Sequence, residues 1–409
     1  MITALLLAFS LQAPDGAKVY EDHCARCHSS AVADARTPQL RVLREKTPQD
    51  ILDELTKGKM QLQGQELTPA ERTAVAGYLG AAAAQAAAVV GKCTTVPPFD
   101  PSKGSSWTSW SPDLTNARFQ PQAGISGDQI PKLALKWAFG FPNSTVATGQ
   151  PTVAGGRVFV GSTSGTVYSL DAATGCIVWT FQAKARVRAG IVIGPRPGMP
   201  NRYAVYIGDG RSNAYALDAT TGEQLWTRNV EDHKSANITG TPVLYQDRLY
   251  IPVSSSEEAQ GANPAYECCT FRGSLVALDA STGALVWKTY TINAEAKPVG
   301  KNKAGATRWG PAGAGIWSSP TVDPKRKVVY AATGNMYTEP QQPTSDSIMA
   351  FDIDTGAVKW ISQVTPQDVF VVGCGALAGG RGSGANCPED SNLGPDYDFG
   401  NAPMLAKAN

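Results

Sequence analysis

The stretch "SLDAATGCIVW", residues 169–179, decides the fold, because the same phrase returns three more times along the chain. In each copy an Asp is followed by Thr-Gly three and four residues later and by Trp at the eighth position. The pattern predicts a β-hairpin whose Gly takes the left-handed conformation of a tight turn. The further copies are "ALDATTGEQLW" (216–226), "ALDASTGALVW" (277–287) and "AFDIDTGAVKW" (350–360).

The repeating unit contains strands and no helix, and its Trp recurs once per unit, as a residue packed between neighbouring sheets would. This favours a β-propeller over a plain β-sandwich, which would not need the same phrase in every unit. The spacing between successive Trp residues grows from 47 to 61 and then 73 residues, so the later intervals contain inserted loops. We expect the functional residues on those loops.

Length and charge narrow the class of protein. A chain of 409 residues predicts two or more domains. The formal net charge of +1 and the lack of a long basic run argue against nucleic acid as a partner. No stretch is long and apolar enough to span a bilayer. The first 13 residues, an apolar run ending in Ala, resemble a short secretory signal without the usual basic start, and a wrongly chosen start is the alternative.

The stretch "CARCH", residues 24–28, has the Cys-x-x-Cys-His pattern of c-type haem attachment. Cys24 and Cys27 would form thioethers to the haem, and His28 would bind the iron. Asp15 is expected to cap the helix that leads into this motif. The alternative is a zinc half-site, but no second Cys pair follows within the next sixty residues.

Met60 is the candidate for the sixth iron ligand, because it is the only methionine between the haem motif and residue 198. Thr47 is expected to cap the helix before it, and Thr68 and Glu71 form a capping box for the helix after it. A Met that merely fills the core is the alternative. His/Met ligation raises the reduction potential, which suits an electron acceptor.

The order of these features resembles small class I cytochromes c across residues 15–90, which implies an all-α domain carrying haem c. The predicted organisation is a signal peptide (1–13), a cytochrome c domain (14–92), a linker (93–104) and an all-β propeller (105–409).

The propeller resembles another known family. The repeated phrase and "WSPDLTNARFQ" (110–120) resemble the quinoprotein alcohol dehydrogenases, eight-bladed propellers that bind pyrroloquinoline quinone (PQQ). The stretch "ECCTFRGS" (267–274) resembles the polyvinyl-alcohol dehydrogenase branch, whose members can have an N-terminal cytochrome c domain. Non-enzymatic outer-membrane assembly propellers share the repeat, so a scaffold without quinone is the alternative.

The resemblance implies roles for the adjacent cysteines. Cys268 and Cys269 would form a disulfide ring against one face of the quinone, with Trp317 on the other face unless Trp317 is a core residue. Asn335 matches the family's calcium-binding Asn. Glu267 is the candidate for the calcium-binding Glu, although the Cys pair sits in a different register from the methanol-oxidising branch.

Three further residues are candidates for the carboxylates of the quinone. The segment "AKARVRAG" offers Arg186 and Arg188, of which one could be merely exposed. Thr241 could hydrogen-bond the cofactor or simply begin a strand.

The stretch "GPDYDFGNAP", residues 394–403, carries two carboxylates two residues apart. Asp398 aligns with the family's catalytic base and would also bind calcium, Asp396 is the reserve, and an Asx turn is the alternative for either. Calcium beside the quinone carbonyl would act as a Lewis acid. Cys374 and Cys387 are expected to pair around a Gly-rich loop.

Together these features predict a periplasmic quinohaemoprotein that oxidises a secondary alcohol, such as polyvinyl alcohol. Electrons would pass from PQQ to haem c and on to an external acceptor such as a soluble cytochrome c. The alternatives are a scaffold propeller and a quinoprotein for another alcohol or sugar. The sequence does not say whether Cys93 and Cys176 meet.

The length of the propeller region predicts how many blades it contains. Residues 105–409 supply about five blades rather than eight, at ~40–45 residues per blade. No fifth copy of the phrase follows Trp360. We therefore expect a chain that is incomplete at its C-terminus and that, alone, carries haem but holds quinone weakly or not at all.

Overall fold

The computed structural model describes residues 14–29, 38–44, 46–80, 91–96, 98–102, 104–142, 144, 146, 148–374, 384–388 and 393–406. The predicted signal peptide lies outside these residues. The chain divides into two compact units, Met1–Val90 with Pro142–Thr145 and Gly91–Phe141 with Val146–Asn409. None of the described helices is long and apolar enough to cross a membrane.

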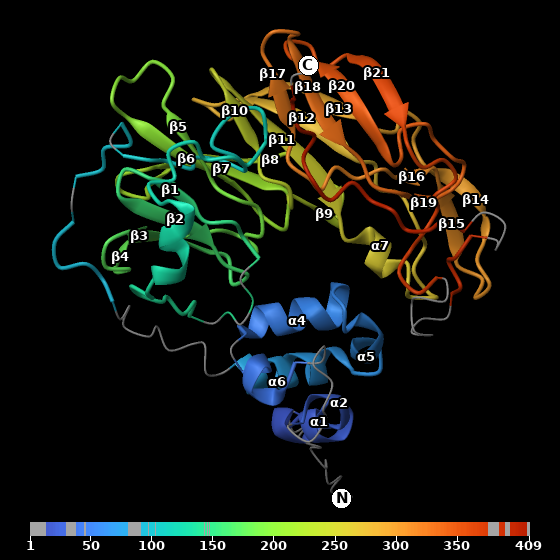
Figure 1. Ribbon diagram of the computed structural model, residues 1–409. Helices are drawn as coiled ribbons and strands as arrows, with labels where there is room; N and C mark the ends of the chain where they lie inside the picture. Colours follow the sequence, from blue (N-terminus) through green and yellow to red (C-terminus); the bar gives the residue numbers. More distant parts are fainter. Residues whose placement is uncertain are drawn as a thin grey trace, which may run out of the picture. The chain divides into compact units, whose positions relative to one another are not determined.

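The described part of the first unit is helical (Figure 1). The helices are α1 (Gly16–His23), α2 (Ala25–His28), α3 (Leu40–Leu43), α4 (Pro48–Lys57), α5 (Gln61–Gln65) and α6 (Pro69–Gly80).

The predicted helix caps are present. The Asp15 side chain accepts a hydrogen bond from the Ala17 N–H at 2.9 Å. Thr47 forms a capping box with Asp50 at the start of α4. The Thr68 N–H donates to Glu71 Oε2 at 2.8 Å, and the Glu71 N–H donates to Thr68 Oγ1 at 3.3 Å. These bonds satisfy N–H groups that the first helical turn leaves without partners.

Helices α1 and α6 cross closely at Gly16, where a Cβ atom would lie 2.2 Å from the Ala74 carbonyl oxygen. The glycine therefore permits the contact, and the Tyr20 and Tyr78 rings lie 5.9 Å apart beside it. The core of this unit is formed by Val19, Tyr20, Ile51, Leu55, Leu67, Val75, Ala76 and Leu79.

The second unit is built from four antiparallel sheets in chain order, each with a path of four strands (Figure 1). The first sheet contains β1 (Thr152–Ala154), β2 (Arg157–Gly161), β3 (Thr166–Asp171) and β4 (Ile177–Gln182). The second contains β5 (Val192–Pro195), β6 (Tyr203–Gly208), β7 (Asn213–Asp218) and β8 (Gln224–Asn229). The third contains β10 (Val243–Tyr245), β11 (Arg248–Ser255), β12 (Ser274–Asp279) and β13 (Leu285–Tyr290), with β9 (Ala236–Asn237) paired to β11. The fourth contains β17 (Thr321–Asp323), β18 (Val328–Ala332), β20 (Ser347–Asp352) and β21 (Val358–Gln363).

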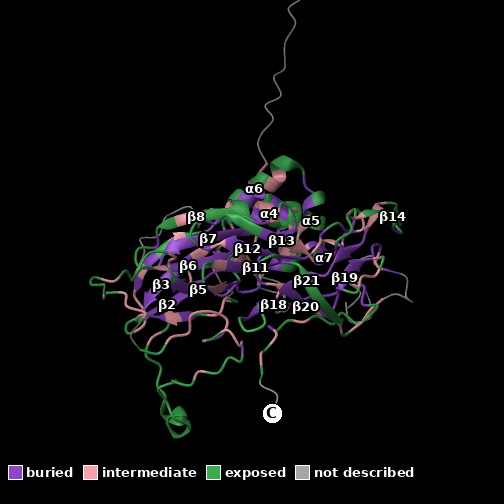
Figure 2. Ribbon diagram, turned by 90° about the horizontal axis from the view of Figure 1, so that it is seen from above, coloured by how far each residue is buried: buried purple, intermediate pink, exposed green. Residues whose placement is uncertain are grey.

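Buried apolar clusters join each sheet to the next. Phe159 and Ile207 belong to the cluster that links the first and second sheets. Tyr206 and Ile251 belong to the one between the second and third, and Val329 lies in the one that includes the third and fourth. Central strands are accordingly buried throughout, as β7 is, whereas β21 is mostly exposed (Figure 2).

The repeated phrase forms the predicted hairpin between the third and fourth strand of each sheet. At its first copy, Asp171 Oδ1 accepts hydrogen bonds from the Thr174 N–H at 2.8 Å and the Thr174 hydroxyl at 2.7 Å. The Gly that follows is left-handed in every copy, with φ of 77°, 78°, 72° and 73° at Gly175, Gly222, Gly283 and Gly356. The Asp therefore closes the turn and the Gly provides its backbone conformation.

The repeated Trp docks on the hairpin of the next sheet. Each indole N–H donates to a carbonyl oxygen in that hairpin: Trp179 to Ala219 at 3.1 Å, Trp226 to Ala280 at 3.0 Å and Trp287 to Ile353 at 3.3 Å. Trp137, outside the repeat, docks on the first sheet in the same way. Trp360 is 45% exposed, against 7–8% for the other three repeated Trp residues. The predicted packing of Trp between neighbouring sheets is confirmed at three of the four copies.

This docking gives a stability prediction. A Cβ atom at Gly283 would lie 2.7 Å from the Trp226 ring, and the residue has a φ of 72°. Gly283→Ala should therefore lower the free energy of unfolding by about 2–4 kcal/mol, from backbone strain and overpacking together. The control is Gly198→Ala, where φ is also 72° but no atom lies within 4 Å. It should lose only about 1 kcal/mol. Equal losses in denaturant unfolding would contradict the docking argument.

The described residues form four blades, where the length of the region predicted about five. The surplus chain lies in loops and short ribbons instead of a further four-stranded sheet. These additional elements are η2 (Gly127–Lys132), α7 (Glu257–Gln260), β14 (Lys297–Lys301), β15 (Thr307–Gly310), β16 (Ala312–Gly313) and β19 (Met336–Thr338).

Three disulfides lie in the second unit. Cys374 pairs with Cys387, as predicted, and Cys268 pairs with its neighbour Cys269. Cys93 pairs with Cys176, a pairing that the sequence left open. Since Cys176 lies in the first hairpin turn, this bond ties the predicted linker to the first blade.

Candidate active site

The haem motif lies at the junction of α1 and α2. His28 is buried, and its Nδ1 lies 2.6 Å from the Pro38 carbonyl oxygen. A proton on Nδ1 shared with that oxygen leaves Nε2 as the nitrogen that can bind a metal. Cys24 and Cys27 are free thiols. The residues therefore fit a covalently attached haem. Met60 is half-buried against the same core, and its role as sixth ligand stays a prediction.

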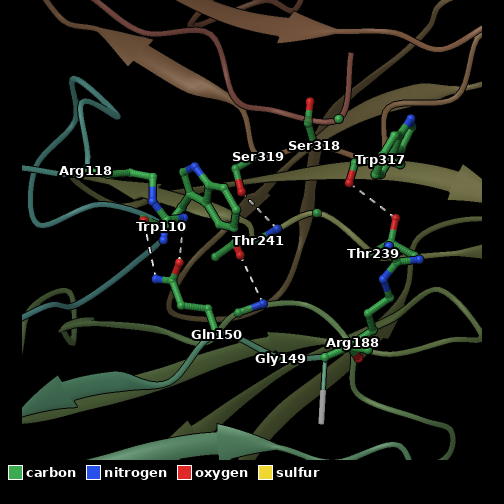
Figure 3. Close-up of a pocket in the computed structure, with 14 residues that line it drawn as sticks. Trp110, Arg118, Gly149, Gln150, Arg188, Thr239, Thr241, Trp317, Ser318 and Ser319 are labelled. Carbon is green, nitrogen blue, oxygen red and sulfur yellow. Dashed lines mark hydrogen bonds between the residues drawn. The ribbon is translucent and has the colours of Figure 1, made fainter. Parts of the chain in front are cut away.

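A pocket of about 350 Å³ lies where the four blades begin (Figure 3). Its walls come from the segments that lead into the first strand of each sheet, at Gln150, Arg188, Thr241 and Trp317. Trp110 and Arg118, from the chain before the first blade, complete one side. The size falls in the usual range for small-molecule sites, about 300–1,000 Å³.

Thr241 connects three of these segments. Its Oγ1 accepts a hydrogen bond from the Gly190 N–H at 3.0 Å, and its own N–H donates to Ser319 Oγ at 3.1 Å (Figure 3). Thr241 thus links the segments that lead into the second, third and fourth blades. The structure places it in the pocket wall and gives it this bracing role as well.

Two arginines line the pocket. Arg188 makes no ion pair or side-chain hydrogen bond with any described residue, and the pKa of its guanidinium is lowered by burial and by the nearby charge of Arg186. An unpaired cation in a pocket is suited to an anionic ligand. Arg118, which the sequence reasoning missed, lies 4.2 Å above the Trp110 ring and donates to Gln150 Oε1 at 2.8 Å.

Arg186 does not line this pocket. It is exposed, and its side chain runs past Gly210, where a Cβ atom would lie 2.8 Å from Arg186 Cγ. Both candidate arginines are thus exposed to solvent, and only Arg188 lines the pocket.

Trp317 forms part of the pocket wall, and Gly400 packs against the edge of its ring. Its indole N–H is buried and makes no hydrogen bond of ordinary geometry with the described residues, although it lies near enough to Asp398 to favour the charged form of that carboxylate. A buried donor without a partner is a candidate for binding a ligand.

Asp398 lies next to Asn335. The Asn335 N–H donates to Asp398 Oδ1 at 2.9 Å, and Asn335 Nδ2 donates to the Met336 and Phe370 carbonyl oxygens at 3.0 and 2.9 Å. The amide oxygen is the remaining polar atom of Asn335. Asp398 is accessible to solvent, yet the pKa of its carboxyl is raised by the surrounding protein and by the charge of Asp368.

Asp398 belongs to a cluster of five carboxylates. Burial and neighbouring negative charges raise the pKa of Glu258 to about 8, that of Asp346 to about 8 and that of Asp396 to about 6. Asp368 anchors the segment of the base, because it accepts hydrogen bonds from the Asp396 N–H at 3.2 Å and the Tyr397 N–H at 2.8 Å. Carboxylates whose pKa values are raised by burial and by one another's negative charge are typical of functional sites.

The cluster has the donor chemistry of a hard cation such as Ca²⁺, which prefers oxygen ligands. Among the described residues, however, no three carboxylate, imidazole or thiolate groups converge closely enough to form a complete metal site. Sequence reasoning missed Glu258 and Asp346. The only available signal for Glu258 was the pair of adjacent glutamates, Glu257 and Glu258, on an inserted loop.

Glu267 does not belong to this cluster as the structure stands. It is exposed, whereas Glu258 is the glutamate whose pKa is raised by the charges of Asp398 and Asp396. The sequence favoured Glu267 because it is adjacent to the Cys pair, but the loop turns the pair inward and leaves Glu267 on the surface.

The Cys268–Cys269 disulfide lies in the core and not on the pocket wall. Both residues are fully buried in the cluster that contains Phe271. Buried Glu257 holds the loop there by accepting hydrogen bonds from the Phe271 N–H at 2.7 Å and the Thr270 N–H at 3.0 Å. The disulfide is present as predicted, and its contact with a quinone remains a prediction.

Three family models match different parts of the chain. One family model, described as cytochrome C oxidase, cbb3-type, subunit III, matches residues 11–79. A second, the outer membrane protein assembly factor BamB, matches 134–267. A third, the glucose/ethanol/alcohol dehydrogenase β-propeller domain, matches 228–372.

Two curated relatives align with nearly the whole chain. A polyvinylalcohol dehydrogenase from a Pseudomonas species is 42% identical over 97% of this chain and 63% of its own length. Another, from a Sphingopyxis species, is 40% identical over 96% of this chain and 62% of its own length. The chain thus spans less than two thirds of these relatives.

Two solved structures share the fold. The quinohemoprotein alcohol dehydrogenase of Comamonas testosteroni superposes with a TM-score of 0.50 at 22% identity, covering 64% of this chain and 41% of that one. The ADHIIG enzyme of Pseudomonas putida gives a TM-score of 0.51 at 24% identity, covering 64% and 40%.

Fold, motif and pocket define a class, a quinoprotein-type propeller joined to a c-type cytochrome domain. Within that class, the chain is similar to the PQQ-dependent alcohol dehydrogenases, through the match of its propeller to the alcohol dehydrogenase domain and the 40–42% identity to the two polyvinylalcohol dehydrogenases.

Proposed function

We propose that the complete protein is a quinohaemoprotein dehydrogenase that oxidises secondary alcohols, with polyvinyl alcohol or a related polyol as substrate. The observation that carries the proposal is Asp398. It is a solvent-accessible carboxylate with a raised pKa, near a pocket that contains an unpaired Arg188 and the unpartnered indole N–H of Trp317. The names of the two relatives that align with nearly the whole chain support the substrate class.

The pocket residues suit PQQ. Arg188 would pair with a carboxylate of the cofactor, Thr241 would hydrogen-bond it, and Trp317 would cover one face of its rings. When bound, PQQ supplies the two-electron acceptor for alcohol oxidation. Asn335 and Asp398 would hold Ca²⁺ through the Asn335 amide oxygen and the carboxylate. The calcium would supply Lewis-acid polarisation.

Asp398 would take the proton of the substrate hydroxyl. Its Oδ1 is held by the Asn335 N–H, which orients the carboxylate and leaves Oδ2 as the atom that can accept. Because the carboxyl's pKa is raised, Asp398 is a stronger base than an ordinary aspartate while remaining accessible to substrate. Asp396 is the reserve for this role.

The cytochrome domain would carry the electrons onward. Cys24 and Cys27 would hold haem c covalently, His28 would bind the iron through Nε2, and Met60 would be the sixth ligand. An external acceptor such as a soluble cytochrome c would then reoxidise the protein. Three disulfides agree with an oxidising compartment, and we propose the periplasm.

The test is an absorbance titration of the full-length gene product purified with its haem. We expect the haem to be reduced when PQQ, Ca²⁺ and polyvinyl alcohol are all present, and to stay oxidised when any one of them is omitted. Secondary alcohols of low molecular weight and sugars serve as alternative substrates. Haem that stays oxidised with every substrate would favour the non-catalytic propeller that the match to the BamB model suggests.

A further inference from the structure

Asp346 is a buried carboxylate without a partner. It lies in the loop between β19 and β20, is 0% exposed, and its main-chain N–H donates to the Gly334 carbonyl oxygen at 3.1 Å. Neither carboxylate oxygen makes a hydrogen bond within the described part of the chain. A buried carboxylate in this state must either hold a proton or meet a cation, because an isolated buried charge is very costly.

The fold satisfies its other fully buried carboxylates. Asp209 accepts hydrogen bonds from the Tyr215 hydroxyl at 2.7 Å and the Asn213 N–H at 2.9 Å. Glu257 accepts from the Tyr266 hydroxyl at 2.8 Å, besides the loop N–H groups described above. The lack of a protein partner is therefore particular to Asp346.

The charges that act on Asp346 are all negative. After burial, the carboxylates of Asp368, Asp398 and Asp396 are the causes that raise its pKa, and no basic side chain of the described residues offsets them. The Gly334–Asn335 segment connects Asp346 to the base, since Gly334 accepts from the Asp346 N–H and Asn335 donates to Asp398. A positive charge near Asp398 would thus also act on Asp346.

We propose that Asp346 is the buried counter-charge of the cation site, and that its carboxylate strengthens the binding of a hard divalent cation between Asp398 and the Asn335 amide oxygen. The inference rests on the proposed function for the presence of that cation. Asp346 does not line the pocket. Its carboxylate would compensate the cation's charge from the side of the β19–β20 loop.

The test is calcium binding by the full-length protein at pH 8 after removal of metal, with and without added PQQ. The propeller's melting temperature is followed as Ca²⁺ is titrated. Asp346→Asn should raise the melting temperature of the metal-free protein, because at pH 8 the carboxyl, with a pKa of about 8, is partly ionised and the amide removes that unpaired charge. The same substitution should weaken calcium binding at least tenfold. If the Asn variant does not fold, Asp346→Ser replaces it.

The matched control is Asp209→Asn, which removes a carboxylate that is equally buried but fully hydrogen-bonded. It should lower the melting temperature with or without calcium and leave the calcium affinity within about twofold. An Asp346→Asn protein that is less stable without metal and binds calcium like the wild type would overturn the inference.

Asp398→Asn separates this inference from the proposed function. If that variant loses calcium binding while Asp346→Asn keeps it, the counter-charge role fails and the proposed cation site stands. If the wild-type protein itself shows no calcium response, with or without PQQ, the cation of the proposed function fails and the inference falls with it.

Discussion

Asp398→Asn is expected to lower the turnover of alcohol by about 10²–10⁴-fold, the usual contribution of general base catalysis. The amide keeps the shape and can still accept the Asn335 N–H, so the haem content and the melting temperature should change little. The measurement is the initial rate of haem reduction with saturating PQQ and Ca²⁺.

Asp396→Asn makes the same change two residues away and discriminates between the two candidate bases. It should cost much less than Asp398→Asn, because Asp396 lacks the contact with Asn335. If the large loss accompanies Asp396 instead, the role of base moves to that residue.

The pH dependence gives an independent check on Asp398. The base acts only when deprotonated, and its pKa is raised from the ordinary aspartate value. In the metal-free protein Asp398 should therefore titrate, as followed by NMR of its carboxyl carbon, through a pKa higher than that of an exposed aspartate, and bound Ca²⁺ should lower that pKa because a nearby cation favours the carboxylate. A metal-free protein in which Asp398 titrates at the ordinary aspartate pKa would argue that solvent, and not the carboxylate cluster, sets the charge of this residue.

Arg188→Met should weaken PQQ binding by about 10–100-fold, since hydrogen bonds to charged groups contribute about 1.5–3 kcal/mol each. Arg188 is the pocket cation without a partner among the described residues, whereas the other pocket arginine, Arg118, already contacts Gln150 and the Trp110 ring. The measurement is equilibrium dialysis of PQQ against the metal-loaded protein, at constant ionic strength.

Arg186→Met is the matched control, two residues away on the same segment. Arg186 is exposed and does not line the pocket, so its loss should change the PQQ dissociation constant by no more than about threefold, through long-range charge alone. A larger effect at Arg186 than at Arg188 would mean that the cofactor binds outside the pocket.

The sequence predicted the repetitive parts of this molecule well, because those parts rest on local geometry. Asp171 and Gly175 close a turn within five residues, and Thr68 and Glu71 cap a helix within four. The haem motif is equally local, since one short helix carries Cys27 and His28.

The acidic cluster could not be predicted in this way, since its members lie far apart in the chain. Glu258 comes from α7, whereas Asp346 and Asp398 come from two different loops, and only the folded blades bring their charges within range of one another. Resemblance located Asp398 and Asn335, whereas Asp346 has no motif around it. The position of Cys268–Cys269 depended on long-range contacts too, because Glu257 and not the local sequence draws that loop into the core.

The docking of each repeated Trp makes the contact between neighbouring blades independent of what lies between them. One ring, one left-handed Gly and one carbonyl oxygen form the contact, and these groups are the same whether 47 or 73 residues separate successive Trp residues. Insertions can therefore lengthen the loops at the mouth without altering the wedge-like fit of the blades. In such an architecture, a segment such as 256–273, inserted between β11 and β12, can differ in length while the contacts between the blades stay the same.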